Sequence, residues 1–324
     1  MCTAITYKSK HHYFGRNLDL EYTYDEAVVI TPRNYRFKFK EKEALTSHFA
    51  MIGVATVIDG YPLYYDATNE MGLSIAGLNF VGNAQYYPRR EGADNLAPYE
   101  LIPWILGTCR DIKDAKESLG AVNLIDTPFR NDLPTAKLHW LVADKNGSFA
   151  VETTKDGMKI YNDPVGVLTN NPPFPFHLQN LTQYLHLTSR EAENRLSKEI
   201  ELTPYSKGFG AFGIPGDLSS PSRFVRASFV KLNSITPENE GESVSQFFHI
   251  LGSVEQQEGA VQSQDGFERT QYTSCCNIDK GIYYYKTYSN NRITAVSLFK
   301  EELDSERLYS FKLITEQDVK YQNG

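Results

Sequence analysis

The sequence predicts an α+β fold, a four-layer αββα sandwich in which two antiparallel sheets pack face to face with helices outside. The first quarter of the 324 residues is almost entirely strand-like, helical periodicity then appears in two separate regions, and the last stretch is strand-like again. Short turn signals join the strands into hairpins, unlike the strand–helix–strand alternation of a parallel sheet. We find no linker, repeat or low-complexity segment, so we expect one domain over residues 1–324.

The N-terminal strands are predicted from runs of β-branched and aromatic residues. Residues 3–7 and 12–19 are two such runs, with a Lys-Ser-Lys turn between them. An Asp59-Gly60 turn separates two later runs in the same quarter of the chain. In chain order, we expect the remaining strands at residues 27–33, 49–58, 61–65, 73–79, 138–144, 148–152, 158–161, 270–277, 281–289, 292–299 and 308–313.

Helical patterns lie between the strand-rich regions. Pro98 suits a first turn, apolar residues recur over 101–106, and Pro103 is expected to kink this helix. Asp111 is a good N-cap for a helix over 112–119, with Gly120 just past its end. We expect further helices at residues 177–187, 222–232 and 243–254, the last two with apolar residues along one face.

Composition narrows the class of function. The net charge of −7 argues against nucleic-acid binding and against bulk affinity for anionic membranes. The N-terminus lacks the regions of a signal peptide, and no apolar run approaches the roughly 18 residues of a membrane span, so we expect a cytoplasmic protein. Four cysteines are few for a disulfide scaffold, and no spacing suggests a zinc site, so we expect no metal.

No cofactor is expected either. Residues 208–213 match the letters of a dinucleotide-binding G-x-G-x-x-G loop. That loop must open a helix, and Pro215-Gly216 follows almost at once, which blocks the helix. A flexible loop near a site is the better interpretation.

Cys2 is the candidate nucleophile. A small residue at position 2 allows Met1 to be removed, which leaves a cysteine with both a thiol and a free α-amine. An N-terminal amine can act as the base for its own side chain. If the first two strands form a hairpin, Arg16 and Asp19 return close to Cys2, where the arginine favours the thiolate and the carboxylate can orient the amine. On these residues alone, a buried inert thiol and a surface ion pair remain the alternatives.

Several stretches, in order along nearly the whole chain, extend this interpretation. Residues 1–4 and 14–19, then 69–80, 138–141, 166–172, 213–224 and 272–276, closely resemble the choloylglycine hydrolases, also called bile salt hydrolases. The resemblance implies an N-terminal nucleophile hydrolase fold and hydrolysis of glycine- or taurine-conjugated bile salts to free bile acid and amino acid. It also implies a homotetramer, a small-molecule substrate and a gut bacterium as the source.

The resemblance assigns further site residues. Asn170, which spacing alone would make a turn cap before Pro172, becomes a site residue, and Asn79 falls on the other polar position of the family. We expect the Asn79 N–H and the Asn170 side chain to hold the oxyanion. Arg223 opposes the macrodipole at a helix start, and the resemblance places it near the nucleophile. The candidates for contact with the steroid are Leu18, Tyr24, Ile58 and Phe129.

Four alternatives remain. Penicillin V acylase shares the Cys-Thr start and the mechanism, but that branch commonly has tyrosine where Asn79 stands here; an N-acyl homoserine lactone amidase is a related variant. A chain that retains Met1 would be an inactive binding module.

A histidine base is the rival mechanism, but nothing marks His139 or His249, and we expect His249 to be a core or boundary residue. A redox role for Cys275-Cys276 is disfavoured because the pair lacks CxxC spacing, and two reduced core thiols are expected.

Overall fold

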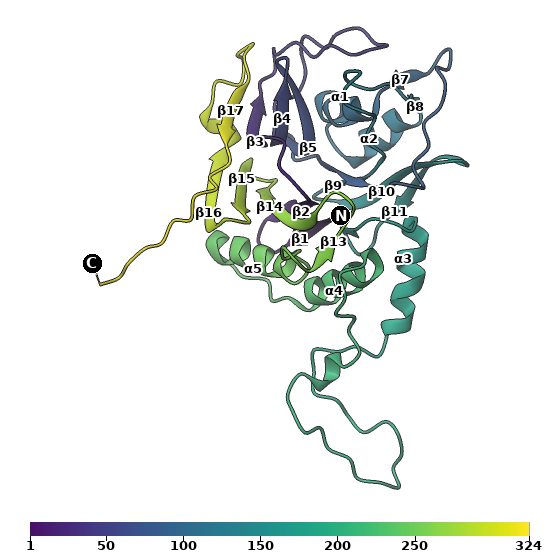
Figure 1. Cartoon of the computed structure of the whole chain (residues 1–324), viewed down its shortest axis with the longest axis vertical. Helices are drawn as coiled ribbons and strands as arrows, with labels where there is room; N and C mark the ends of the chain where they lie inside the picture. Colours follow the sequence, from purple (N-terminus) through teal and green to yellow (C-terminus); the bar gives the residue numbers. More distant parts are fainter. Residues whose placement is uncertain (324) are drawn as a thin grey trace.

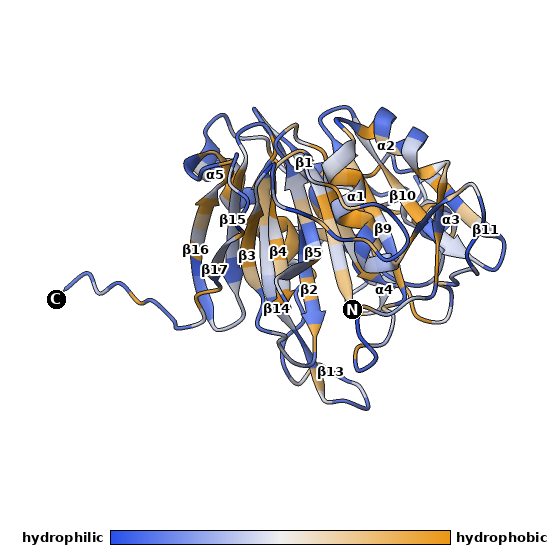
Figure 2. Cartoon of the chain, turned by 90° about the horizontal axis from the view of Figure 1, so that it is seen from above, coloured by the Kyte–Doolittle hydropathy of each residue, from blue (hydrophilic) through white to orange (hydrophobic). Residues whose placement is uncertain are grey.

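A computed structural model describes residues 1–323 and has the predicted αββα architecture (Figure 1). Two antiparallel sheets face one another, and helices cover the outer face of each. Figure 2 shows apolar residues concentrated on the strands and polar residues in the loops around them. None of the helices within the described residues combines the length and the apolarity needed to cross a bilayer.

The first sheet has the strand order β12-β1-β2-β14-β15-β16, with β13 attached to β14. Its two central strands, β2 and β14, therefore come from opposite ends of the chain. The bounds are β1 Cys2–Lys8, β2 His12–Leu20, β12 Val167–Leu168, β13 Val261–Gln262, β14 Phe267–Asn277, β15 Ile282–Thr287 and β16 Asn290–Ser297.

The second sheet has the order β11-β10-β9-β6-β5-β4-β3-β17. Its bounds are β3 Ala27–Thr31, β4 Met51–Ile58, β5 Tyr61–Asn69, β6 Ser74–Asn79, β9 Leu138–Asp144, β10 Gly147–Thr154, β11 Gly157–Asn162 and β17 Tyr309–Lys312. A small parallel pair, β7 Asp94–Leu96 and β8 Val122–Leu124, lies outside both sheets.

The helices divide between the two outer layers. α1 (Leu101–Thr108) and α2 (Ile112–Leu119) contact β5, β6 and β9, whereas α4 (Ser220–Asn233) and α5 (Glu240–Gly252) contact β1, β2 and β14. α3 (Phe174–Leu181) packs on α4. Single 3₁₀ turns occur at η1 Pro98–Glu100, η2 Thr182–Tyr184, η3 Phe209–Ala211 and η4 Leu298–Lys300.

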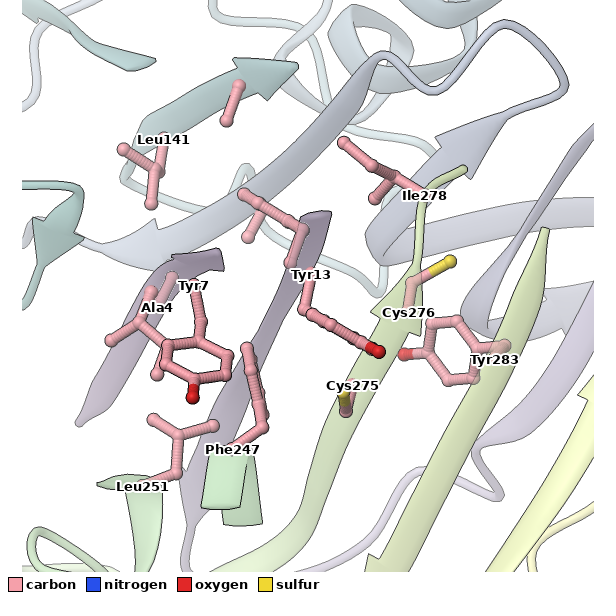
Figure 3. Close-up of a cluster of buried hydrophobic side chains, with 14 of the residues drawn as sticks. Ala4, Tyr7, Tyr13, Leu141, Phe247, Leu251, Cys275, Cys276, Ile278 and Tyr283 are labelled. Atoms are coloured by element: carbon pink, nitrogen blue, oxygen red, sulfur yellow. The ribbon is translucent and has the colours of Figure 1, made fainter. Parts of the chain in front are cut away.

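Two apolar cores join these layers. One fills the space between the sheets and continues under α5, where Phe247 and Leu251 lie near Tyr7 of β1 (Figure 3). The other lies between the second sheet and α1 and α2. Cys275 and Cys276 are free, buried thiols of the first core, as the sequence predicts.

Several predicted boundaries are wrong for identifiable reasons. The helix expected over 177–187 is α3, which begins at Phe174, directly after Pro172-Pro173, and ends at Leu181. Pro103 lies in the first turn of α1, where no intrahelical bond needs its missing N–H, so α1 continues through it. β7, β8, β12 and β13 escaped prediction because two or three residues carry no periodic signal.

Candidate active site

The β1–β2 hairpin places Cys2 at one end of the first sheet. Cys2 lies opposite Leu18, and Ala4 lies opposite Arg16, so the expected hairpin is confirmed. Residues directly opposite one another project on the same face, and alternate residues project on the other. Cys2, Arg16 and Leu18 therefore share the face toward the second sheet, while Asp19 is on the face toward the helices. Cys2 is only 3% exposed.

Arg16 is completely buried between the sheets. Its Nη1 donates to the carbonyls of Tyr65 (3.0 Å) and Gly77 (2.5 Å) on the second sheet. Burial alone would lower the pKa of this guanidinium, but nearby negative charge, that of the Cys2 thiolate first, holds the pKa above its usual value. Arg16 thus carries positive charge next to Cys2.

Asp66 is a buried carboxylate, missed by sequence reasoning, whose charge acts on Arg16. Its carboxylate accepts hydrogen bonds from the hydroxyls of Tyr272 (2.7 Å) and Tyr283 (2.5 Å) on the first sheet. Burial raises the pKa of this carboxyl, and the charge of Arg16 opposes the rise. No motif marks Asp66 in the sequence, because its partners lie about 200 residues away along the chain.

Asp19 lies beside the chain terminus. Its backbone N–H donates to the carbonyl of Met1 (3.0 Å), and its Oδ1 accepts from the Thr270 hydroxyl (2.6 Å). Among the described residues, its buried Oδ2 has no hydrogen-bond partner. Burial raises the pKa of Asp19, and the terminal ammonium and Arg223 oppose that rise. An unpaired carboxylate oxygen is therefore available next to the N-terminus.

Met1 occupies the end of the β1–β2 pairing. Its ammonium donates to the backbone carbonyl of Asp19 (2.8 Å) and forms an ion pair with Glu268 of β14. With Met1 in place, the nitrogen of Cys2 is an amide, and it donates to Asn170 Oδ1 (2.8 Å). Removal of Met1 converts that same nitrogen into an amine.

Asn170 connects the predicted site residues. Its Oδ1 accepts from the Cys2 nitrogen and from Arg223 Nη2 (2.7 Å), and its Nδ2 donates to the carbonyl of Asn79 (2.8 Å). The neighbouring Asn171 instead donates to the carbonyl of Val81 (2.5 Å). The carboxamide that contacts Cys2 is therefore that of Asn170, the residue selected by the family pattern.

Arg223 lies in the first turns of α4 and is fully buried, so it is not the solvated arginine that its helix position alone would allow. Its Nη1 donates to the Cys2 carbonyl and to the Thr3 hydroxyl, both at 2.6 Å. Burial lowers the pKa of this guanidinium, while the negative charges of Asp19 and Cys2 raise it. Arg223 therefore fixes the first residues of β1 from the helix side.

Asn79 supplies backbone groups at the end of β6. The N–H of Phe80 donates to Lys137 on the β9 side (2.8 Å). Backbone groups alternate between the two edges of a strand, so the N–H of Asn79 points to the other edge. On that edge β5 has already stopped pairing, and Gly77 accepts from Arg16. The Asn79 N–H thus faces the site with no strand beside it.

The candidate steroid contacts are more dispersed. Leu18 is buried beside Cys2, whereas Tyr24 is exposed and its carbonyl accepts from Thr56 of β4. Ile58 pairs with Tyr61 at the β4–β5 turn, and the Phe129 ring lies 5.5 Å from the Tyr61 ring. Ile58 and Phe129 therefore gather at the same turn. A place in the substrate site remains a prediction for all four.

Two cavities lie elsewhere. One of about 520 Å³ is lined by Tyr87, Arg89, Arg90 and Lys155, among others, and one of about 210 Å³ includes Thr6, Tyr13 and Lys231 at the far end of the hairpin. Among the residues that the structure describes, Cys2 is not part of the lining of either cavity. Residues 1–323 contain no group of three or more His, Cys, Asp or Glu side chains placed to hold a metal ion.

The two histidines considered as alternative bases, His139 and His249, lie in different environments. His139 is buried, and its two ring nitrogens already contact Glu152 (3.0 Å) and the Thr169 carbonyl (2.9 Å). His249 is exposed, so the expectation of a core or boundary residue is wrong. Its neighbours Phe248 and Ile250 turn inward, which directs position 249 outward.

Comparison with known proteins identifies the family of this chain. Residues 2–311 match the family of linear amide C–N hydrolases, choloylglycine hydrolase family. A bile salt hydrolase/transferase of Lactiplantibacillus plantarum is 52% identical over 98% of both chains, and one of Clostridium perfringens is 36% identical over 96% of this chain and 97% of that protein. A solved mutant of the conjugated bile acid hydrolase from Clostridium perfringens superposes with a TM-score of 0.92 at 35% identity over the whole of both chains.

A penicillin V acylase from Agrobacterium tumefaciens has the same fold at a greater distance. Its TM-score is 0.74 at 18% identity, over 95% of this chain and 90% of that chain.

Proposed function

This chain belongs to the choloylglycine hydrolase family of linear amide C–N hydrolases, and from that premise we propose that it hydrolyses the amide bond of glycine- and taurine-conjugated bile salts, with Cys2 as the nucleophile. The observation that carries the proposal is the Asn170 carboxamide, which bonds the Cys2 nitrogen, Arg223 and Asn79 at once. This contact joins the candidate base to the candidate oxyanion donors around one thiol.

The first step is the loss of Met1. The Cys2 nitrogen then becomes an amine that keeps Asn170 Oδ1 as an acceptor and has the unpaired Asp19 Oδ2 in its surroundings. These two acceptors orient the amine so that its lone pair takes the thiol proton, directly or through one water. Arg16 and Arg223 stabilise the resulting thiolate with positive charge from either side of β1.

In the next step, the thiolate attacks the amide carbonyl and forms a C–S bond, while the carbonyl π electrons move onto oxygen. The Asn79 N–H and the second hydrogen of Asn170 Nδ2 donate to that oxyanion. The protonated amine then gives its proton to the leaving nitrogen, and the C–N bond breaks. Water, deprotonated by the same amine, attacks the thioester and releases the bile acid, which restores the thiol.

The bile-salt assignment rests on relatives that this chain covers over 97–100% of their length, two of them named bile salt hydrolase/transferase and one named conjugated bile acid hydrolase. Asn79 agrees with it, because the penicillin V acylase branch commonly carries tyrosine there. We propose that the steroid lies against Leu18, Tyr24, Ile58 and Phe129. The apolar side chains among them would bury sterol surface that water solvates poorly.

The direct test compares Cys2→Ala with the unmodified chain on glycocholate and taurocholate, with free cholate measured by chromatography. Turnover should disappear in Cys2→Ala and persist in Cys109→Ala, a matched control at another buried free thiol. Undiminished cleavage by Cys2→Ala would refute the nucleophile. Parallel assays with penicillin V and an N-acyl homoserine lactone would reassign the substrate if either is cleaved faster than the bile salts.

We also propose a cytoplasmic homotetramer. Residues 185–212 form an arm that projects from the body (Figure 1) and expose large apolar side chains such as Leu185, Leu196 and Tyr205. A second copy of the chain would cover these side chains, because monomers rarely expose so much apolar surface. Light scattering after size exclusion should give four times 36.8 kDa, and a monomeric mass would contradict the proposal.

A further inference from the structure

Two buried histidines flank the Asn170 segment and take no part in the proposed chemistry. We propose that His139 and His177 are positioning residues that fix the Asn170 carboxamide relative to Asn79 and Arg223, an inference that rests on the proposed role of Asn170. Both side chains are completely buried, and each bonds a consecutive backbone carbonyl of this segment.

His139 acts from β9. Its Nε2 contacts the Thr169 carbonyl at 2.9 Å, and its Nδ1 contacts Glu152 Oε1 of β10 at 3.0 Å. The same Glu152 oxygen accepts from the backbone N–H of Phe174, the first residue of α3 (2.9 Å). The loop that carries Asn170 is thereby tied to the second sheet at both of its ends.

His177 acts from inside α3. Its Nε2 contacts the carbonyl of Asn170 itself at 2.9 Å. Burial lowers the pKa of His177, which keeps the ring neutral near pH 7. A carbonyl can only accept a hydrogen bond, so the Nε2 of His177 carries its proton, and the same argument applies to the Nε2 of His139. Each ring thus donates one directed hydrogen bond to the Asn170 segment.

The packing of the two rings connects them to the other site residues. The His139 ring stacks on Phe80, the residue after Asn79, at 4.2 Å between centroids and 5° between planes. The His177 ring stacks on Phe224, the residue after Arg223, at 4.9 Å and 23°. Each histidine therefore joins the Asn170 loop to an element that carries a partner of the Asn170 carboxamide, Asn79 in one case and Arg223 in the other.

Ser220 completes the support on the α4 side. Its hydroxyl contacts the Asn170 backbone N–H (2.8 Å) and the Thr169 hydroxyl (2.9 Å). With the two histidines in place, the Thr169 carbonyl and both backbone polar groups of Asn170 are bonded. A backbone held in this way leaves the carboxamide few orientations, and the catalytic contribution of an oxyanion donor depends on that orientation.

The test uses amide side chains that imitate one ring nitrogen each. Glutamine places its NH₂ near the position of Nε2, whereas asparagine is shorter and reaches only as far as Nδ1. We expect His139→Gln and His177→Gln to keep kcat on bile salts within about threefold, and the asparagine variants to lose about 10- to 100-fold in kcat with KM nearly unchanged. A loss in kcat without a change in KM shows that the oxyanion donor is misoriented, whereas a general loss of structure would also weaken substrate binding.

His48 provides a matched control. It is also a buried histidine between two carbonyls, those of Tyr35 and Phe49, each at 2.8 Å, and it packs near Phe37. His48→Asn should lower the melting temperature as much as His177→Asn does but leave kcat within about threefold, because it lies outside the Asn170 scaffold. Equal kcat for the glutamine and asparagine variants, or an equal kcat loss in His48→Asn, would overturn the proposal.

A failure of the proposed function is recognised separately. If the unmodified chain cleaves no bile salt, kcat cannot be compared. The crystal structures of His139→Asn and His177→Asn then test the positioning role without an activity measurement. We then expect Asn170 Oδ1 to move out of hydrogen-bond distance of Arg223 Nη2. An unchanged Asn170–Arg223 contact in both variants would refute the positioning role whatever the substrate is.

Discussion

Asn170→Asp changes one atom of the site and tests the oxyanion assignment. The substitution keeps Oδ1, which accepts from the Cys2 nitrogen and Arg223, but it replaces the Nδ2 donor with an acceptor that faces the Asn79 carbonyl. Loss of one oxyanion donor typically lowers kcat by about 10²- to 10³-fold, or about 2.7–4 kcal/mol of transition-state stabilisation. KM should change little, because the oxyanion is absent from the bound substrate.

The assay is initial-rate kinetics of glycocholate cleavage, with circular dichroism to show that the variant folds. Asn171→Asp is the control, since it makes the same change one residue away, where Nδ2 donates to the Val81 carbonyl. That control should keep kcat within about threefold of the unmodified chain. The reasoning is refuted if folded Asn170→Asp retains more than a tenth of the kcat, or if both variants lose activity equally.

Further predictions concern the terminus, a buried cation and a buried carboxyl. A chain with lysine inserted between Met1 and Cys2, which blocks trimming, should lose about 10³-fold or more in turnover, with mass spectrometry to verify the terminus. Arg223→Met should lower the free energy of unfolding by about 3–5 kcal/mol in urea titrations, because Asp19 loses a nearby buried cation; a loss under about 1 kcal/mol would contradict this. Burial raises the pKa of Asp163 from 3.8 to about 6, so its contribution to stability is full below about pH 4 and is lost as the pH rises through 6. The difference in unfolding free energy between the unmodified chain and Asp163→Asn should therefore change by about 3 kcal/mol between pH 4 and pH 7, and a constant difference would exclude this cause.

The sequence was most informative where local signals repeat. The two N-terminal runs predicted the hairpin, and its register does place Arg16 and Asp19 near the start of the chain. Asp111 was predicted as an N-cap, and its carboxylate accepts from the N–H groups of Lys113 and Asp114. These features depend on neighbours within about twenty residues, which is the range over which composition and periodicity act.

What the sequence could not predict depends on partners that are distant in the chain. Glu152 and His177 are ordinary polar residues in sequence, and their importance follows only from the loop between β12 and α3 folding over β9. Asp66 is similar, because its tyrosine partners come from the opposite sheet. Periodicity can place a side chain on a buried face, but the partner on the facing layer is fixed only by the tertiary fold.

The strand order of the first sheet also determines when β2 can pair during synthesis of the chain. β2 is among the first strands to leave the ribosome, yet its neighbour β14, which carries the Glu268 partner of Met1, follows on the order of 250 residues later. At about 5–20 residues per second, this delay lasts on the order of 10–50 s. Throughout that time the nascent N-terminus has no carboxylate partner from β14, so Met1 is not yet held by the ion pair with Glu268. The Met1 removal that we propose therefore breaks no ion pair with Glu268 as long as β14 has not been synthesised.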